Sequence, residues 1–441
     1  MAMIPQKRLF GWEEIENLGD LERLDLVLRH LPDEELMRAL EKERGQGRDD
    51  YPVRAVWNSL LAGVVYEHAS VEGLRRELRR NAQLRQVCGF DPARGEKAVP
   101  TPRAYTEFLR KLFRHEKMIE AMFDRLVAEL TKELGDFGTV LAADGKALRT
   151  HARPAGKDHA KRTPDGRRDT EADFGMKTYR GKRSDGTPYE EVRKWFGYKL
   201  HLVVDATYEL PVSYEVTEAS ASELTEGKKR IASLSERHPE ILKRCEAVAA
   251  DRAFDDGKWV RELWDERGIK PVIDIRDAWQ DGEETKLVSG TRNVVYDYRG
   301  TVYCHCPKTG ERRAMAYGGF EKDRQALKYR CPAAHYGLEC GGRERCPAGN
   351  SVRVPLKEDR RVFTPLARSS YAWKRVYAKR TAVERVNGRL DVSFGFERHF
   401  IRGLTKMKVR MGLALAVMLT MALGRVREKK KGLMRSLVHA A

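Results

Sequence analysis

The sequence predicts an α/β protein that begins with an all-helical segment and is interrupted by a small cysteine-rich insert. Apolar residues recur with helical spacing from residue 12 to about residue 134. From Thr139 they come instead in short runs, separated by turn residues and helical patterns as far as Arg276. Such a succession of strands followed by alternating helices and strands is typical of a mixed sheet with flanking helices.

Two helix starts are marked in the first part of the chain. Ser70 stands where an N-cap is expected before Val71, Leu74 and Leu78, and Thr101 precedes a proline at the first helical position. The face opposite the apolar residues of the first of these helices carries Arg75, Arg76, Arg79 and Arg80. This arginine face fits either a DNA-docking surface or a solvated helix, and both interpretations stay open.

Two apolar runs in the second part end in aspartate. GTVLAAD ends at Asp144 and EAVAAD at Asp251, and the strings KLHLVVDA and LPVSYEVTEA predict two further strands between them. Open α/β sheets place their sites at the carboxyl ends of strands, although an aspartate there is also a common turn former. Residues 151–193 are rich in Arg, Lys, Gly and Asp, so we expect a loop that becomes ordered on DNA.

Composition narrows the class of partner. The 441 residues predict two or three domains, and 84 Lys+Arg against 66 Asp+Glu give a net charge of +18. Such an excess favours a polyanionic partner, above all nucleic acid. The start of the chain lacks the apolar region of a secretory signal, and the run from Leu413 to Leu423 is too short to span a bilayer. We therefore expect a cytoplasmic protein without a membrane partner.

Five of the seven cysteines are clustered in one segment, in an insert expected over residues 279–360. Cysteines beside glycine and proline turns in a cytoplasmic chain favour a structural zinc site. Their spacing does not give paired C-x-x-C knuckles, so free thiols remain the alternative. The zinc candidates are Cys304, Cys306, Cys331, Cys340 and Cys346.

A polar stripe is predicted along the helix YAKRTAVERVNGRLD near the carboxyl end. At about 100° per residue, Tyr377, Arg380 and Glu384 share one face, which Asn387 and Asp391 continue. An arginine fork beside a carboxylate suits phosphate and metal chemistry. The alternative is an ordinary amphipathic helix with an ion pair between Arg380 and Glu384.

Taken together, several strings resemble the DDE transposases of bacterial insertion sequences. ADGK resembles the segment of their first catalytic Asp, and ADRAFDD that of the second. RTAVERVNGRL resembles their Y-R-E-K signature helix, and the region from about Pro52 through VPTPRAYTEFLRKL resembles their helical N-terminal domain. The resemblance spans nearly the whole chain and implies an RNase H-like catalytic fold. The domains expected are 1–135 (helical, DNA-binding), 136–278 (catalytic, first part), 279–360 (cysteine-rich insert), 361–428 (catalytic, carboxyl-terminal helices) and 429–441 (basic tail).

The resemblance also implies a site and a reaction. Asp144, Asp251 and Glu384 would hold two Mg²⁺ or Mn²⁺ ions for cleavage at transposon ends and 3′-OH strand transfer into target DNA. A backbone phosphate would be held by Tyr377 and Arg380. The implied partners are double-stranded DNA, as terminal inverted repeats and target, and a second copy of the chain as a homodimer.

Two positions depart from the family pattern. Asp391 stands where the signature has lysine, so either a nearby base such as Arg389 binds the phosphate or the copy has lost activity. Glu223 stands where relatives often carry Asp, and we expect it to lie outside the site. A decayed or domesticated DNA-binding protein and an RNase H-like nuclease without strand transfer therefore remain alternatives.

Overall fold

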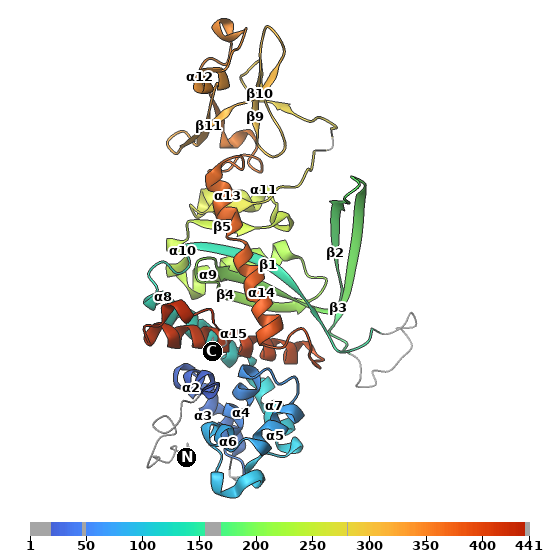
Figure 1. Ribbon diagram of the computed structural model, residues 1–441, viewed down its shortest axis with the longest axis vertical. Coiled ribbons are helices and arrows are strands. Elements are labelled where there is room, and N and C mark those ends of the chain that lie inside the picture. Colours follow the sequence, from blue (N-terminus) through green and yellow to red (C-terminus); the bar gives the residue numbers. More distant parts are fainter. Residues whose placement is uncertain (1–18, 46–49, 155–168, 280, 437–441) are drawn as a thin grey trace.

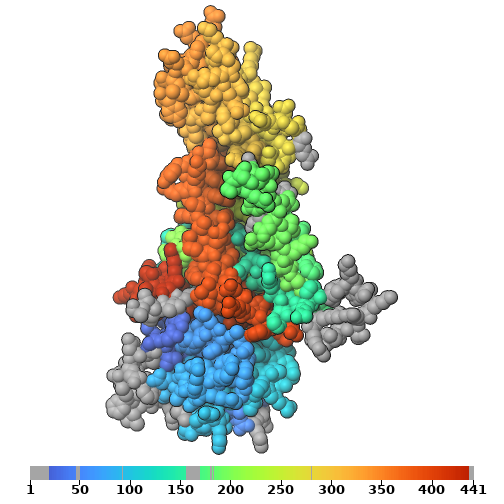
Figure 2. Space-filling view, turned by 45° about the vertical axis from the view of Figure 1, so that its right-hand side comes forward, coloured from blue at the N-terminus to red at the C-terminus, as the bar shows by residue number. Residues whose placement is uncertain are grey.

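The molecule is long, with three parts arranged end to end (Figures 1 and 2). The computed structural model describes residues 19–45, 50–154, 169–279 and 281–436. The N-terminal helices form one end, the cysteine-rich insert forms the other, and a mixed sheet with its helices lies between them. This arrangement places the sheet next to both neighbouring parts.

The N-terminal part is helical in the described residues, as predicted. Ser70 Oγ accepts from Gly73 N at 3.1 Å and Thr101 Oγ1 accepts from Ala104 N at 3.2 Å, so both predicted caps are confirmed. The arginine face is only partly available, because Arg75 is buried and donates to Pro100 O and Glu72. The helices are α2 (Leu21–His30), α3 (Glu34–Arg44), α4 (Val53–Val65), α5 (Val71–Arg80), α6 (Ala82–Cys88), α7 (Pro102–Leu112) and α8 (Glu116–Glu133).

The long helix α15 (Leu404–Arg427) joins the helical part to the sheet. It packs against α2, α4 and α8 on one side and against β4 on the other. By length and composition α15 could cross a membrane, but 94% of its apolar window is buried inside this protein. One hydrophobic core therefore runs from the N-terminal helices through α15 into the sheet. The helical part shares this core and does not have one of its own.

The central sheet is the RNase H-like mixed sheet that the sequence predicts. Its strands follow the order β2-β3-β1-β5-β6, and β4 also pairs with β3. The β1, β3 and β4 strands are antiparallel neighbours, whereas β5 and β6 run parallel to β1. Helix α9 (Glu223–Arg237) packs on β1, β3 and β4. The strands are β1 (Val140–Arg149), β2 (Asp173–Lys182), β3 (Pro188–Asp205), β4 (Leu210–Glu218), β5 (Ala247–Ala250) and β6 (Lys270–Ile273).

Two sequence-based expectations about this sheet are wrong. Strand β1 does not end at Asp144, because β3 continues to pair with it as far as Arg149. Residues 173–193 are not a loop: β2 and the first half of β3 form a hairpin arm that projects from the sheet (Figure 1). Both faces of this arm are largely exposed, and apolar residues such as Phe174 and Met176 are few among its charged ones, so its sequence gives only a weak strand signal. Residues 155–168 lie outside the described part.

The insert has a hydrophobic core of its own, centred on residues such as Val294, Leu327 and Val354. Its strands form a four-stranded and a three-stranded sheet. The chain enters the insert after β6 and, on leaving it, continues into α13 (Tyr371–Ala378) and α14 (Thr381–Ser393). Its strands are β7 (Lys286–Leu287), β8 (Val294–Tyr296), β9 (Val302–His305), β10 (Arg312–Ala314), β11 (Ala316–Glu321), β12 (Ala326–Arg330) and β13 (Ser351–Pro355), and its helix is α12 (Pro332–Tyr336).

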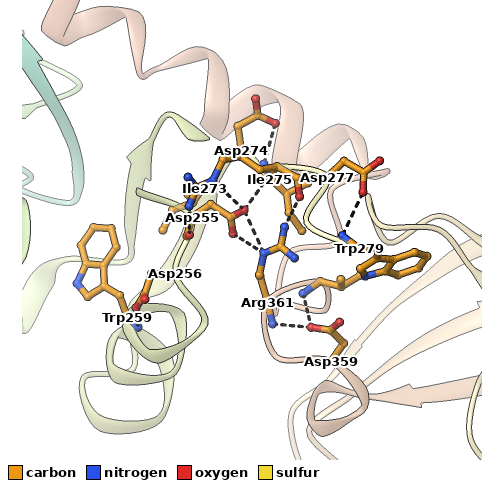
Figure 3. A network of polar contacts seen from close by, with 12 residues as sticks. Asp255, Asp256, Trp259, Ile273, Asp274, Ile275, Asp277, Trp279, Asp359 and Arg361 are labelled. Carbon is orange, nitrogen blue, oxygen red and sulfur yellow. Dashed lines mark hydrogen bonds and ion pairs between the residues drawn. The ribbon is translucent and has the colours of Figure 1, made fainter. Parts of the chain in front are cut away.

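An ion pair with a buried carboxylate links the segment after β5 to the chain that returns from the insert (Figure 3). The Asp255 side chain is 1% exposed and accepts from Arg361 Nε at 3.0 Å and from Arg276 N at 2.8 Å. Arg361 follows the last strand of the insert, whereas Asp255 lies four residues beyond Asp251. The network therefore ties the segment after the second predicted acid to the returning chain.

Candidate active site

The first two predicted acids lie side by side because of the strand register. The last register pair between the parallel strands β1 and β5 is Ala143 with Ala250. The next residue on each strand is an aspartate, Asp144 on β1 and Asp251 after β5. Asp251 Oδ1 also accepts from Ala253 N at 2.8 Å, which holds the turn that follows β5. The two carboxylates thus meet where the parallel pairing stops.

The third carboxylate of this cluster is Glu223, which corrects the expectation that it lies outside the site. Carboxylate oxygens of Asp144, Glu223 and Asp251 all lie within 4.8 Å of one another. Glu223 is the first residue of α9, and Ser222 before it caps the helix by accepting from Thr225 N at 3.3 Å. The cap fixes the start of α9 over β1, and with it the position of Glu223.

Gly145 leaves the space that Glu223 occupies. A Cβ built at Gly145 would lie 2.7 Å from Cγ and Cδ of Glu223, closer than side chains approach one another. On its other side Glu223 Oε1 lies 3.7 Å from Lys199 Nζ, and its side chain is only 14% exposed. The glycine after Asp144 therefore permits the approach of the third acid.

Burial and mutual repulsion disfavour the negative charges of this cluster, and a bound cation would offset both effects. Burial raises the pKa of Asp144 to about 6, and the charges of Asp251 and Glu223 add to this rise. Burial also raises the pKa of Glu223. Lys177 from the β2–β3 arm acts in the opposite direction on both groups. Three crowded carboxylates with hard oxygen donors fit a divalent ion such as Mg²⁺ or Mn²⁺.

Glu384, the third acid expected from the sequence, lies outside this cluster on α14. Its side chain is 51% exposed, and Arg380 Nη2 donates to its Oε1 at 2.7 Å. The predicted continuous helix is divided here into α13 and α14. Arg380 N bonds to Tyr377 O and Val383 N to Arg380 O, so one turn is tightened to i→i−3 bonding. Tyr377 and Glu384 consequently lie on different helices.

Tyr377 and Arg380 nevertheless lie beside the acids. Burial raises the pKa of Tyr377, and the charges of Asp274 and Asp251 add to it. Burial opposes the charge of Arg380, but the hydrogen bond to Glu384 and the nearby Asp144 charge raise its pKa overall. Tyr377 also stacks on Trp373 with ring centroids 4.6 Å apart, which fixes its ring.

Arg389 and Asp391, the two residues considered at the signature lysine position, each have a partner within the protein. Arg389 donates to Glu209 O and lies 3.8 Å from Glu209 Oε2, and its side chain is 13% exposed. The structure thus places Arg389 against Glu209, away from the acid cluster. Asp391 instead pairs with Lys146, whose Nζ lies 2.6 Å from Asp391 Oδ2.

The five insert cysteines are free and lie near one another. Burial raises the pKa of Cys304 to about 11, and the charges of Cys331, Cys346 and Cys340 add to this rise. Cys306 and Cys340 interact through their side chains. In the described part of the chain, however, no three thiols bring their Sγ atoms within 4.8 Å of one another, in contrast to the three acids. Cys88 and Cys245 are buried in the main core.

Sequence reasoning missed three contributors to this site: Glu223, Lys146 and Lys177. Signals for the first existed in the Ser222–Glu223 cap and in the glycine after Asp144. Lys177 carries no such signal, because its position depends on an arm whose strands were not predicted.

A mixed sheet with three carboxylates at the point where its parallel strands stop is an arrangement that can hold a divalent cation. Comparison of the sequence with protein families identifies the family. The family described as transposase DDE domain matches residues 135–420, and the transposase domain family DUF772 matches residues 12–111. The chain therefore belongs to the DDE transposases, a family that uses divalent metal ions.

No curated protein matches the chain. Among solved structures, the piggyBac transposase in a synaptic complex with hairpin DNA is similar at 11% identity with a TM-score of 0.39. That match covers 96% of this chain and 80% of the other.

Proposed function

We propose that this transposase cuts DNA at the ends of a mobile element and joins the freed 3′-OH to target DNA. The observation that supports this most is the cluster of Asp144, Glu223 and Asp251, with oxygens within 4.8 Å of one another. Phosphodiester transfer needs charge neutralisation at phosphate and an activated oxygen nucleophile. A bound divalent ion supplies both.

Mg²⁺ or Mn²⁺ is the proposed ion, because both prefer hard carboxylate oxygens. Asp144 would lie at the centre of the ligand set, with Asp251 and Glu223 beside it. All three must be deprotonated to act as ligands, so ion binding has to overcome the raised pKa values of Asp144 and Glu223.

Glu384 remains a candidate ligand for a second ion. It would have to leave Arg380, which is paired with Glu384 and also lies close enough to Asp144 for that charge to act on it. Releasing Glu384 would also free the Arg380 fork for a phosphate of the DNA, with Tyr377 beside it. We propose Tyr377 and Arg380 as phosphate-binding residues; Arg389 is left out because Glu209 holds it.

The partners proposed are double-stranded DNA and a second copy of the chain. The net charge of +18 supports binding to DNA, both as terminal repeats and as target. Two element ends have to be brought together for transposition, and a homodimer would supply one site for each end. The place of action would be the bacterial cytoplasm, on the nucleoid.

A test uses the full chain with Mg²⁺ and duplexes that carry the DNA flanking its gene. Cleavage at an inverted repeat followed by joining to a second duplex is the expected result. Cleavage without joining would identify a nuclease, and binding without cleavage a decayed copy. Arg380→Ala should weaken end binding or cleavage; an unchanged rate would leave Arg380 as a helix ion pair.

A zinc site in the insert is a second metal proposal, supported by five free cysteines close together in a part with a small core of its own. Its thiols would have to move closer, with Cys340 central because it interacts with both Cys306 and Cys304. We expect about one zinc per purified chain and a Co²⁺–thiolate absorption band, both lost in Cys340→Ser and kept in Cys245→Ala. Substoichiometric zinc would contradict the proposal.

A further inference from the structure

The ion pair between Lys146 and Asp391 lies at the edge of the acid cluster. Lys146 is two residues after Asp144 on β1, and residues two apart in a strand share a face of the sheet. Its ammonium therefore lies on the same face as the Asp144 carboxylate. The Lys146 side chain is 14% exposed and that of Asp391 34%, so solvent reaches the pair.

Asp391 extends the stripe of Glu384 along α14, because seven residues make nearly two full turns. An aspartate alone would put a negative charge where a DNA backbone passes the acids, and Lys146 cancels that charge. Arg380 at the start of α14 and Lys146 opposite its end thus place two cations on the α14 side of the cluster.

We propose that Lys146 binds a backbone phosphate of the DNA substrate and that Asp391 holds its ammonium in position. The inference rests on the proposed function, since it takes DNA as the substrate. A lysine ammonium has three donors, so one hydrogen bond to Asp391 leaves two for phosphate oxygens. Holding the side chain in advance reduces the rotamer entropy that binding would otherwise cost.

The competing interpretation is a clamp that only fastens α14 to β1. The two interpretations differ in the sign of one effect. If Lys146 binds phosphate, Lys146→Met weakens DNA binding. Asp391→Asn then strengthens it, because the amide oxygen can still accept from the Lys146 ammonium and hold it in position, whereas the negative charge that repels DNA is lost. If the pair is only a clamp, both substitutions weaken it and both weaken binding alike.

The experiment measures the affinity of the full chain for a mixed-sequence duplex without divalent ions, over a range of salt concentrations. Lys146→Met should bind about threefold to tenfold more weakly, with a salt slope smaller by about one. Lys146→Arg should keep the slope of the wild type. Lys132→Met, which removes a 72% exposed lysine paired with Glu129, is the matched control and should change neither.

Thermal unfolding of the same variants separates folding from binding, since Lys146→Met and Asp391→Asn should lower Tm by similar small amounts. Equal weakening of DNA binding by both, or no effect of either, would overturn the inference. The proposed function fails separately: if the two variants show opposite-signed binding effects but the wild-type protein never cuts DNA with Mg²⁺, transposition is refuted and Lys146 remains a phosphate ligand.

Discussion

The two helices beside β1 treat their glutamates in opposite ways. Helix α9 brings Glu223 into the acid cluster, where its side chain is 14% exposed. Helix α14 keeps Glu384 outside, 51% exposed and bonded to Arg380 at 2.7 Å. The residue type is the same in both cases, so the difference lies in what surrounds each carboxylate.

Burial is the first part of that difference and space the second. Glu223 is desolvated, has its pKa raised, and enters a gap that Gly145 leaves open. Glu384 faces solvent and has its charge satisfied by a neighbour one turn away. A crowded, desolvated carboxylate gains much more from a cation than a solvated one that is already paired. We therefore expect α9 to matter for metal binding before α14 does.

The largest effect is expected at Asp144, which lies between the two helices. Asp144→Asn removes the carboxylate charge that acts both on the acid cluster beside α9 and on Arg380 beside α14. It should lower the Mg²⁺-dependent cleavage rate at least about 1,000-fold, equivalent to about 4 kcal/mol. Single-turnover cleavage of an element-end duplex measures it. DNA binding should be kept, and Asp281→Asn in the insert is the control, because that exposed carboxylate pairs with Lys286 and accepts from Glu283 N within the insert. A variant that cuts at the normal rate would remove Asp144 from the site.

The next effect is a dependence of stability on pH without metal. The pKa of Asp144 is raised from 3.8 to about 6, so the folded protein holds a proton there that the unfolded chain has already lost. The free energy of unfolding should therefore fall as pH rises from about 4 to about 6, by up to about 3 kcal/mol. Glu223, whose pKa is also raised, contributes with the same sign.

Thermal or urea unfolding across this pH range, with and without Mg²⁺, measures that dependence. Mg²⁺ should stabilise the protein more at pH 7 than at pH 5, because it binds the deprotonated acids. Asp144→Asn should flatten the metal-free profile. A profile that is equally steep in the variant would assign the titration to other groups.

A direct comparison of the two glutamates comes next in size. Glu223→Gln should lower cleavage about 100-fold and weaken Mn²⁺ binding, since it removes a charge from the assembled cluster. Glu384→Gln should leave Mn²⁺ binding to the DNA-free protein nearly unchanged. If Glu384→Gln weakens ion binding more than Glu223→Gln does, the family-based triad is correct and α14 moves inward in solution.

Much of this architecture follows from the sequence alone. The change from helical to strand periodicity at Thr139, the paired runs that end near Asp144 and Asp251, and the caps at Ser70 and Thr101 all rest on local patterns. Local patterns are strong when a segment buries one face. They fail for the β2–β3 arm, because a hairpin exposed on both faces is mostly charged, and the few apolar residues such as Phe174 and Met176 are too short a run to reveal its period.

The site was predictable only as far as register allowed. Asp144 and Asp251 meet because parallel strands align their ends, which strings of apolar residues can indicate. Glu223, Lys146 and Arg389 depend on how α9 and α14 are rotated and placed on the sheet, and the sequence does not specify this. Arg389 could therefore be expected at a phosphate while it is in fact paired with Glu209.

The smallest effect is expected at Gly145, and it tests why the two helices differ. Gly145→Ala places a Cβ 2.7 Å from the Glu223 side chain, so Glu223 must shift and cleavage should fall about tenfold with little change in DNA affinity. The matched control is Gly388→Ala within α14, where nothing lies within 4 Å of the added Cβ. That substitution should stabilise the protein by about 0.5–1 kcal/mol and leave cleavage unchanged, because alanine favours a helix interior. Equal activity of both alanine variants would show that the approach of Glu223 to Asp144 is not needed for cleavage.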